Sequence, residues 1–177
     1  MEIEYEVRFL EIDKERIIER LEELGAIKKG DYNQKRYVYN LVPSQEGKWI
    51  RLRTNGSITT LTYKDIEKDT VDGTREVEVQ VDDFEKTNEL LERIGFKNKG
   101  YQENKRTQYI LNGVEIDIDS WPMIPTYLEI EGKSEEEIIK IQKLLNMDES
   151  KKTMLNCKDI YMQIYGIDID KIKELKF

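Results

Sequence analysis

The stretch LEELGAIKKG, from Leu21 to Gly30, returns seventy positions later as LERIGFKNKG, from Leu91 to Gly100. The same offset aligns further identical residues on both sides, over about forty positions, and a shared offset of that length indicates a duplicated unit. At 177 residues the chain is long enough to bury a sizeable core in one domain. We therefore predict a single domain over 1–177, divided into a first half at 1–70, a second half at 71–133 and C-terminal helices at 134–177.

Each half is predicted to contain one strand, one helix and three further strands. Asp13 and Asp83 are suited to cap the N-termini of the two helices, and Gly25 and Gly95 are suited to end them. The Asn112-Gly113 pair is the strongest short signal for a hairpin turn. The predicted strands lie at 2–10, 35–41, 48–54 and 58–65 in the first half, and at 74–82, 104–111, 114–119 and 126–131 in the second.

The C-terminal part is predicted to be helical. Ser134 and Glu137 form a capping box for a helix that ends near Leu145. Further helices are expected over 156–165 and 168–176.

Eight mostly antiparallel strands are enough to close a barrel or tunnel. The apolar faces of these strands are expected to lie outside, because both repeat helices have apolar stripes that would cover them. We therefore predict an α+β fold: an eight-stranded, mostly antiparallel β tunnel (barrel) with a charged lumen, helices packed outside, two pseudo-repeated βαβββ halves, and C-terminal helices. The stripes consist of Ile17, Leu21 and Leu24 in the first helix, and of Leu90, Leu91 and Ile94 in the second.

Charged residues of a single sign recur on one face of several strands. Every second side chain of a strand points to the same side, so Glu4 and Glu6 share a face, as do Arg51 and Arg53. In one strand, alternating charge usually marks the solvated side of an antiparallel sheet. Repeated doublets of one sign favour a common charged lumen instead. The other acidic sets are Glu76 and Glu78; Glu115, Asp117 and Asp119; and Glu129 and Glu131.

The basic residues suit a chain of phosphates, because a guanidinium group can pair with two phosphate oxygens at once. The carboxylates would repel such a chain unless a divalent cation lay between them. Mg²⁺ or Mn²⁺ prefers oxygen ligands and shares substrate phosphates. We therefore predict triphosphate binding by Arg8, Arg51, Arg53, Lys64 and Arg106, and metal binding by Glu4, Glu6, Glu129 and Glu131.

The composition argues against several other functions. A net charge of -8 at pH 7 disfavours general binding to nucleic acid or an anionic membrane. The absence of histidine removes imidazole bases and histidine-ligated metals. Cys157 is the single cysteine, so no internal disulfide can form, and neither a signal peptide nor a membrane-spanning run is evident. We expect a cytoplasmic protein that is a monomer or homodimer.

The ordered set of charged motifs resembles the CYTH family, also called triphosphate tunnel metalloenzymes, which includes class IV adenylyl cyclases, thiamine triphosphatases and inorganic triphosphatases. EYEVR, from Glu4 to Arg8, is similar to the family signature Glu-x-Glu-x-Lys, with Arg8 in place of the lysine. The likeness runs from residue 2 to about 133. Later family motifs are matched by RLR at Arg51–Arg53, Lys64, EVE at Glu76–Glu78, Arg106, DID at Asp117–Asp119 and LEIEG at Leu128–Gly132.

This resemblance implies a divalent-metal-dependent enzyme that acts on a triphosphate-bearing substrate. It implies catalytic roles for Arg8, Glu76, Glu78 and Asp119, the last three as further metal ligands or salt-bridge partners. An arginine cannot act as a base at neutral pH, so Arg8 is expected to slow or redirect attack by water. A triphosphatase is slightly favoured, because the sequence shows no base-recognition motif. The alternatives are a class IV-type adenylyl cyclase, which converts ATP to cyclic AMP and pyrophosphate, and a non-catalytic module that binds polyphosphate or nucleotide.

Overall fold

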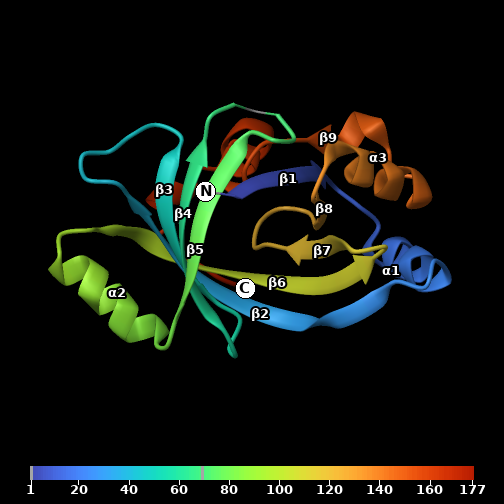
Figure 1. Cartoon of the computed structure of the whole chain (residues 1–177). Helices are drawn as coiled ribbons and strands as arrows, with labels where there is room; N and C mark the ends of the chain where they lie inside the picture. Colours follow the sequence, from blue (N-terminus) through green and yellow to red (C-terminus); the bar gives the residue numbers. More distant parts are fainter. Residues whose placement is uncertain (1, 69) are drawn as a thin grey trace.

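Eight antiparallel strands close into a barrel in the computed structural model, which describes residues 2–68 and 70–177 (Figure 1). The ring order is β6-β2-β3-β4-β5-β1-β8-β7, and pairing between β7 and β6 closes the ring. The predicted α+β barrel is therefore confirmed. Its strands are β1 (Glu2–Phe9), β2 (Ile27–Asn40), β3 (Lys48–Thr54), β4 (Thr59–Ile66), β5 (Thr74–Val81), β6 (Asn98–Leu111), β7 (Val114–Ser120) and β8 (Tyr127–Gly132).

The two halves of the sequence have the same order of elements and exchange their first strands. Helix α1 (Lys14–Glu23) follows β1, and helix α2 (Phe84–Arg93) follows β5. β1 pairs with β8 of the second half, and β5 pairs with β4 of the first. Where the halves meet, equivalent residues are directly paired. These pairs, Gln34 with Asn104 and Glu4 with Thr74, show that an approximate two-fold axis relates the halves.

Helices cover the outer face of the barrel on two sides (Figure 1). Ile17 and Leu21 of α1, with Ile138 of α3 (Glu135–Leu144), pack on apolar residues of β1, β6, β7 and β8. Phe84 and Leu91 of α2 pack on β2 and β3. The three helices begin as predicted: the side chains of Asp13, Asp83 and Ser134 each accept a hydrogen bond from a backbone N–H of the first turn.

The predicted apolar stripe of α2 is wrong at two of its three positions. Leu90 is 60% exposed and Ile94 is 63% exposed. Leu91 is buried together with Phe84, because these two positions are seven residues apart and share one helix face.

The predicted lengths of β2 and β6 are also wrong. They begin at Ile27 and Asn98, rather than at 35 and 104. Each early part pairs with the late part of the other strand, as Ile27 does with Ile110 and Asn98 with Tyr39. Backbone hydrogen bonds extend both strands through segments whose side chains are mostly polar, so apolar alternation did not reveal them.

The C-terminal part is less helical than predicted. The helix expected over 168–176 is instead the 3₁₀ turn η3 (Ile169–Lys171) and strand β10 (Glu174–Leu175), which pairs with β6 in parallel. The helix expected over 156–165 consists of α4 (Cys157–Asp159) and the π-helix η2 (Ile160–Ile164). The 3₁₀ turn η1 (Glu149–Lys151) leads into β9 (Lys152–Thr153), which pairs with β1.

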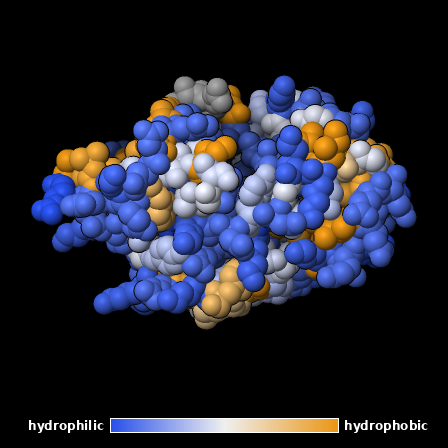
Figure 2. Space-filling model, turned by 90° about the horizontal axis from the view of Figure 1, so that it is seen from below, coloured by the Kyte–Doolittle hydropathy of each residue, from blue (hydrophilic) through white to orange (hydrophobic). Residues whose placement is uncertain are grey.

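The C-terminal segment packs on the loop between β7 and β8. Tyr161 donates a hydrogen bond to the carbonyl of Pro122 at 2.6 Å, and its ring meets Trp121 edge-on. The face in Figure 2 is mostly hydrophilic, with apolar side chains in separate patches. In the described part of the chain, no helix is both long and apolar enough to cross a membrane.

Candidate active site

The predicted charged residues share the inner face of the barrel. Residues that are directly opposite on neighbouring strands point to the same side of a sheet. Arg51 lies opposite Thr62, which lies opposite Glu78, and Arg8 lies opposite Glu129. Because helices cover the other face, these side chains point into the lumen.

Three pairs of equivalent lumen positions in the two halves carry opposite charges. Arg36 of β2 and Arg106 of β6 are equivalent at the offset of seventy. Arg36 faces Arg53 on β3, whereas Arg106 faces Asp119 on β7, so Arg53 and Asp119 are equivalent too. By the same pairing, Arg51 corresponds to Asp117, and Lys64 corresponds to Glu131.

This inversion gives the lumen two walls of opposite charge. In the ring order, β3 and β8 are four strands apart in either direction, so they lie on opposite sides of the barrel. We call the residues Arg36, Arg51, Arg53 and Lys64 of β2–β4 the basic wall. We call the residues Glu6, Glu115, Asp117, Asp119, Glu129 and Glu131 of β1, β7 and β8 the acidic wall.

Arg106 neutralises the centre of the acidic wall. Its guanidinium group forms ion pairs with Asp117, with Asp119 at 2.6 Å and with Glu129 at 3.2 Å. Burial lowers the pKa of Arg106, but Asp119, Asp117 and Glu129 hold it well above its ordinary value. Arg106 was predicted to bind triphosphate, yet three carboxylates of the protein already surround it.

Arg8 links the acidic wall to the C-terminal segment. It forms ion pairs with Glu6 at 2.7 Å and Glu129 at 2.6 Å, and it donates a hydrogen bond to the carbonyl of Leu155 at 3.0 Å. Burial raises the pKa of Glu129, but Arg8, Arg106 and other cations hold it well below its ordinary value. Glu129 is therefore ionised and held by two guanidinium groups.

Glu131 has an uncompensated negative charge when it is ionised. It lies directly between Glu6 on β1 and Glu115 on β7. Burial, followed by the carboxylates of Glu4, Glu129, Glu115 and Glu6, raises its pKa to about 8. Over residues 2–68 and 70–177, no lysine or arginine forms an ion pair with Glu131.

The outer members of the basic wall have acidic partners from neighbouring strands. The Lys64 amine lies 2.7 Å from Glu4 and 3.3 Å from Glu76. Arg51 lies 3.5 Å from Glu78, which also accepts a hydrogen bond from Thr62 at 2.6 Å. Glu76 and Glu78, which were predicted to be catalytic, thus contact the basic wall.

Arg53 has no such partner among the described residues. Arg51, burial and Arg106 together lower its pKa to about 9, against the opposing charges of Glu78 and Glu129. A guanidinium group whose pKa falls this far lies where the protein supplies too little negative charge. An anion bound beside Arg53 would supply that charge.

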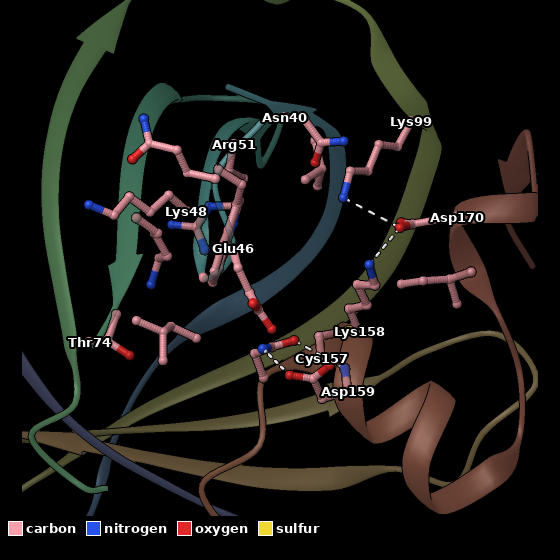
Figure 3. A pocket seen from close by; sticks show the side chains of 18 of the residues that line it. Asn40, Glu46, Lys48, Arg51, Thr74, Lys99, Cys157, Lys158, Asp159 and Asp170 are labelled. Atoms are coloured by element: carbon pink, nitrogen blue, oxygen red, sulfur yellow. Dashed lines mark hydrogen bonds and ion pairs between the residues drawn. The ribbon is translucent and has the colours of Figure 1, made fainter. Parts of the chain in front are cut away.

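A cavity of about 890 Å³ opens from the lumen and extends beyond it. Its inner lining includes Glu6, Arg8, Arg51 and Lys64. Figure 3 shows the outer part, which is lined by Glu46 and Lys48 on one side and by Cys157, Lys158 and Asp159 of the C-terminal segment on the other. The cavity therefore joins the charged lumen to a wider mouth.

The predicted metal ligands do not converge in this structure. Glu4 is paired with Lys64, and Glu6 and Glu129 are paired with Arg8. Within the residues that the structure describes, no three acidic side chains form a group that could hold a metal ion. Metal binding there requires some of these carboxylates to leave their basic partners.

The chemistry of the donors nevertheless suits a hard divalent cation, which prefers carboxylate oxygens. Glu131 lacks a basic partner in the described chain, and the buried Oδ1 atom of Asp117 has no hydrogen-bond partner there. Burial raises the pKa of Asp117 to about 8 despite the opposing charge of Arg106. Both carboxylates would be stabilised in their ionised form by a nearby cation.

Arg36 was not among the predicted site residues, although it lines the cavity. The offset of seventy residues aligns it with Arg106, and this signal could have identified it from the sequence. What the sequence does not show is that Arg36 faces Arg53 rather than a carboxylate.

Comparisons with known proteins agree with this architecture. The sequence model of the CYTH domain matches residues 2–156. A protein of Methanocaldococcus jannaschii, MJ0240, whose name proposes adenylate cyclase activity, is 27% identical over 179 residues, which cover 93% of this chain and 99% of that protein. The structure of PH1012 from Pyrococcus horikoshii OT3 is 28% identical, with a TM-score of 0.76 over 87% of this chain and 96% of that one.

A more distant structure has the same fold. HpAC1 from Hippeastrum is 16% identical, with a TM-score of 0.63 over 94% of this chain and 96% of that one. It is described as a proposed adenylyl cyclase with a dominant triphosphatase activity. At this identity the likeness shows the fold alone.

Proposed function

Because this chain belongs to the CYTH domain family, we propose that it is a divalent-metal-dependent enzyme that hydrolyses a triphosphate-bearing substrate in the barrel lumen. The observation that supports this most strongly is the pair of opposing charged walls. Arg53 lacks an acidic partner on one wall, and Glu131 lacks a basic partner on the other, within the described residues. A phosphate chain with a divalent cation would supply both missing charges.

The basic wall would bind the phosphate chain. Arg51 and Arg53 lie two residues apart on β3 and point to the same side, so their guanidinium groups can contact successive phosphates. Lys64 lies on the neighbouring strand and faces the same lumen. Arg106 would contribute less, since three carboxylates already neutralise it.

The acidic wall would hold Mg²⁺ or Mn²⁺ through Glu131, with Glu129, Glu4 and Glu6 as further ligands. When bound, such an ion neutralises phosphate oxygens and orients them. Glu131 would contribute the carboxylate that is free of a basic partner in the described chain.

Arg8, Glu76, Glu78 and Asp119 are proposed to position this machinery. Burial lowers the pKa of Arg8, but Glu129 and Glu6 hold it well above its ordinary value, so Arg8 stays protonated and cannot accept a proton from water. Arg8 instead orients Glu6 and Glu129. Positioning and charge neutralisation would supply most of the catalysis, as in other phosphoryl transfers.

Cyclisation of ATP is the second candidate, and the shape of the cavity favours it. The cavity continues from the lumen to the loop at 44–48 and to the segment at 156–159, which leaves room for a group larger than a phosphate chain. A nucleoside could occupy this mouth while the triphosphate lies in the lumen. The name of the M. jannaschii relative is consistent with that reaction.

Product analysis separates these reactions. The protein is incubated with tripolyphosphate or ATP and with Mg²⁺ or Mn²⁺, and the products are identified by phosphorus NMR. Orthophosphate is expected from hydrolysis, whereas cyclic AMP with pyrophosphate would identify a cyclase. Unchanged substrate with tight binding would show a non-catalytic binding module and contradict the proposal. Lys35→Gln is a matched control, because Lys35 is exposed and lies next to a lumen position on β2.

A further inference from the structure

Arg36 and its equivalent Arg106 differ sharply in their acidic partners. Arg106 forms ion pairs with three carboxylates. Arg36 forms none with any acidic side chain over residues 2–68 and 70–177, although it lines the cavity that opens from the lumen. The cause is the residue opposite each arginine: Asp119 faces Arg106, whereas Arg53 faces Arg36.

The side chain of Arg36 is nevertheless held in place. Its Nε donates a hydrogen bond to Oε1 of Gln102 at 2.7 Å, and its guanidinium carbon lies 4.2 Å from the ring centroid of Trp121. Gln102 is 2% exposed and Trp121 is 4% exposed, so both supports belong to the buried structure. The guanidinium group also contacts the thiol of Cys157, but burial raises the pKa of that thiol, so it is neutral and supplies no negative charge. Little side-chain entropy would be lost on binding, because the group is already ordered.

Arg36 and Arg53 together form a pair of like charges on adjacent strands. Like charges directly opposite each other destabilise a sheet. Elsewhere in the described lumen, Arg8, Arg51, Lys64 and Arg106 each have an acidic partner. Two guanidinium groups that have no carboxylate partner among the described residues therefore call for an anion from outside the protein.

We infer that Arg36 and Arg53 form a phosphate subsite, in which a phosphate group at one end of the substrate chain binds between two guanidinium groups. This inference rests on the proposed function. It fixes the position of one end of the substrate's phosphate chain in the lumen. The subsite adjoins the C-terminal segment, because Asn156 and Cys157 line the cavity together with Arg36. Arg36 would thus determine how far the phosphate chain enters the lumen.

Calorimetry with tripolyphosphate tests the subsite directly. The titration is done in EDTA, where no divalent cation supports turnover, on the wild type, Arg36→Gln and Lys35→Gln. We expect Arg36→Gln to weaken binding by about tenfold or more, the order of a lost charge-assisted contact. Lys35→Gln should bind as the wild type does, because Lys35 is exposed and adjacent in sequence.

Equal affinity of the wild type and Arg36→Gln would overturn the subsite and leave the proposed hydrolysis intact. Failure of the wild type to bind tripolyphosphate in EDTA would also overturn it, while the product analysis decides the proposed function separately. If Arg36→Gln unfolds at a lower temperature than the wild type, Arg36→Lys replaces it in the titration. This variant keeps the positive charge but loses the planar fork of the guanidinium group. It should therefore bind tripolyphosphate at least about threefold more weakly than Lys35→Gln does. Equal affinity of Arg36→Lys and Lys35→Gln would again overturn the subsite.

Discussion

The two halves of the barrel place equivalent arginines in opposite electrostatic surroundings. Arg106 faces Asp119 and is held by three carboxylates, whereas Arg36 faces Arg53 and has no carboxylate partner within the described chain. The backbone positions are the same, and the strand next to each arginine differs in charge. The duplicated frame thus provides two similar positions, and the neighbouring strand decides whether the arginine stabilises the protein or is free for a ligand.

The largest difference between the halves should appear in stability. Arg106→Gln is expected to lower the free energy of unfolding by about 3–5 kcal/mol, because it leaves buried carboxylates without their partner. Arg36→Gln should cost about 1 kcal/mol, since it removes a hydrogen bond and a stacking contact. Chemical denaturation at pH 7 measures both. Equal losses of unfolding free energy in the two variants would contradict the difference in surroundings between Arg36 and Arg106.

Arg53 should affect binding rather than stability. Arg53→Gln is expected to weaken tripolyphosphate binding by about 2 kcal/mol, which is roughly thirtyfold. The free energy of unfolding should not decrease, because the variant removes repulsion between Arg53 and its neighbours Arg51 and Arg106. Calorimetry and denaturation on one preparation test both points, with Lys35→Gln as control. A marked loss of stability without a loss of affinity would place Arg53 in the framework of the protein.

Glu131 makes the acidic wall sensitive to pH. Its pKa is raised from 4.5 to about 8, so between these values the folded state keeps a proton that the unfolded state releases. Stability should therefore fall as the pH rises from about 4.5 to about 8. Glu131→Gln should remove that part of the decrease, which thermal unfolding at a series of pH values would show.

The same carboxylate should make metal binding depend on pH. Mg²⁺ or Mn²⁺ binds the ionised form, so the rise in Tm on adding the ion should be larger at pH 9 than at pH 6. Glu131→Gln should lose most of this rise. If it keeps the full rise, Glu131 is not a metal ligand.

Replacement of Arg8 by lysine should cost less stability than Arg106→Gln does. Arg8→Lys is expected to lower the free energy of unfolding by about 1–2 kcal/mol, because one ammonium group cannot reproduce the forked contacts with Glu6, Glu129 and the carbonyl of Leu155. Denaturation at pH 7 measures this. A loss as large as that of Arg106→Gln would make Arg8 the main support of the acidic wall.

The barrel could be predicted from the sequence because the duplication and the alternating strands are local patterns. Asp13, Asp83 and Ser134 marked the helix starts correctly for the same reason. The early parts of β2 and β6 were missed, since their pairing partners lie 59 or more residues away and their side chains are mostly polar. Leu90 and Ile94 were misplaced because an apolar residue on a helix does not reveal which face meets the barrel.

The sequence could predict which charged residues line the lumen, but not which of them form ion pairs with each other. Alternation placed Arg51, Arg53 and Glu131 on the lumen face, and the structure brings them there. Which charges neutralise each other depends on the cross-strand register, and a linear sequence does not state that register. Arg36 and Arg106 occupy matching positions in the repeat, so only the strands beside them distinguish a free arginine from a paired one.

The central claim is that the phosphate chain binds to the basic wall, while Arg106 stays bound to the acidic wall. Side-chain NMR of the arginine Nε–H groups tests this claim most directly, during a titration of ¹⁵N-labelled protein with tripolyphosphate in EDTA. Single arginine variants assign the resonances. The account predicts that the signals of Arg36, Arg51 and Arg53 shift and that the signal of Arg106 stays in place. A shift confined to Arg106 would contradict it.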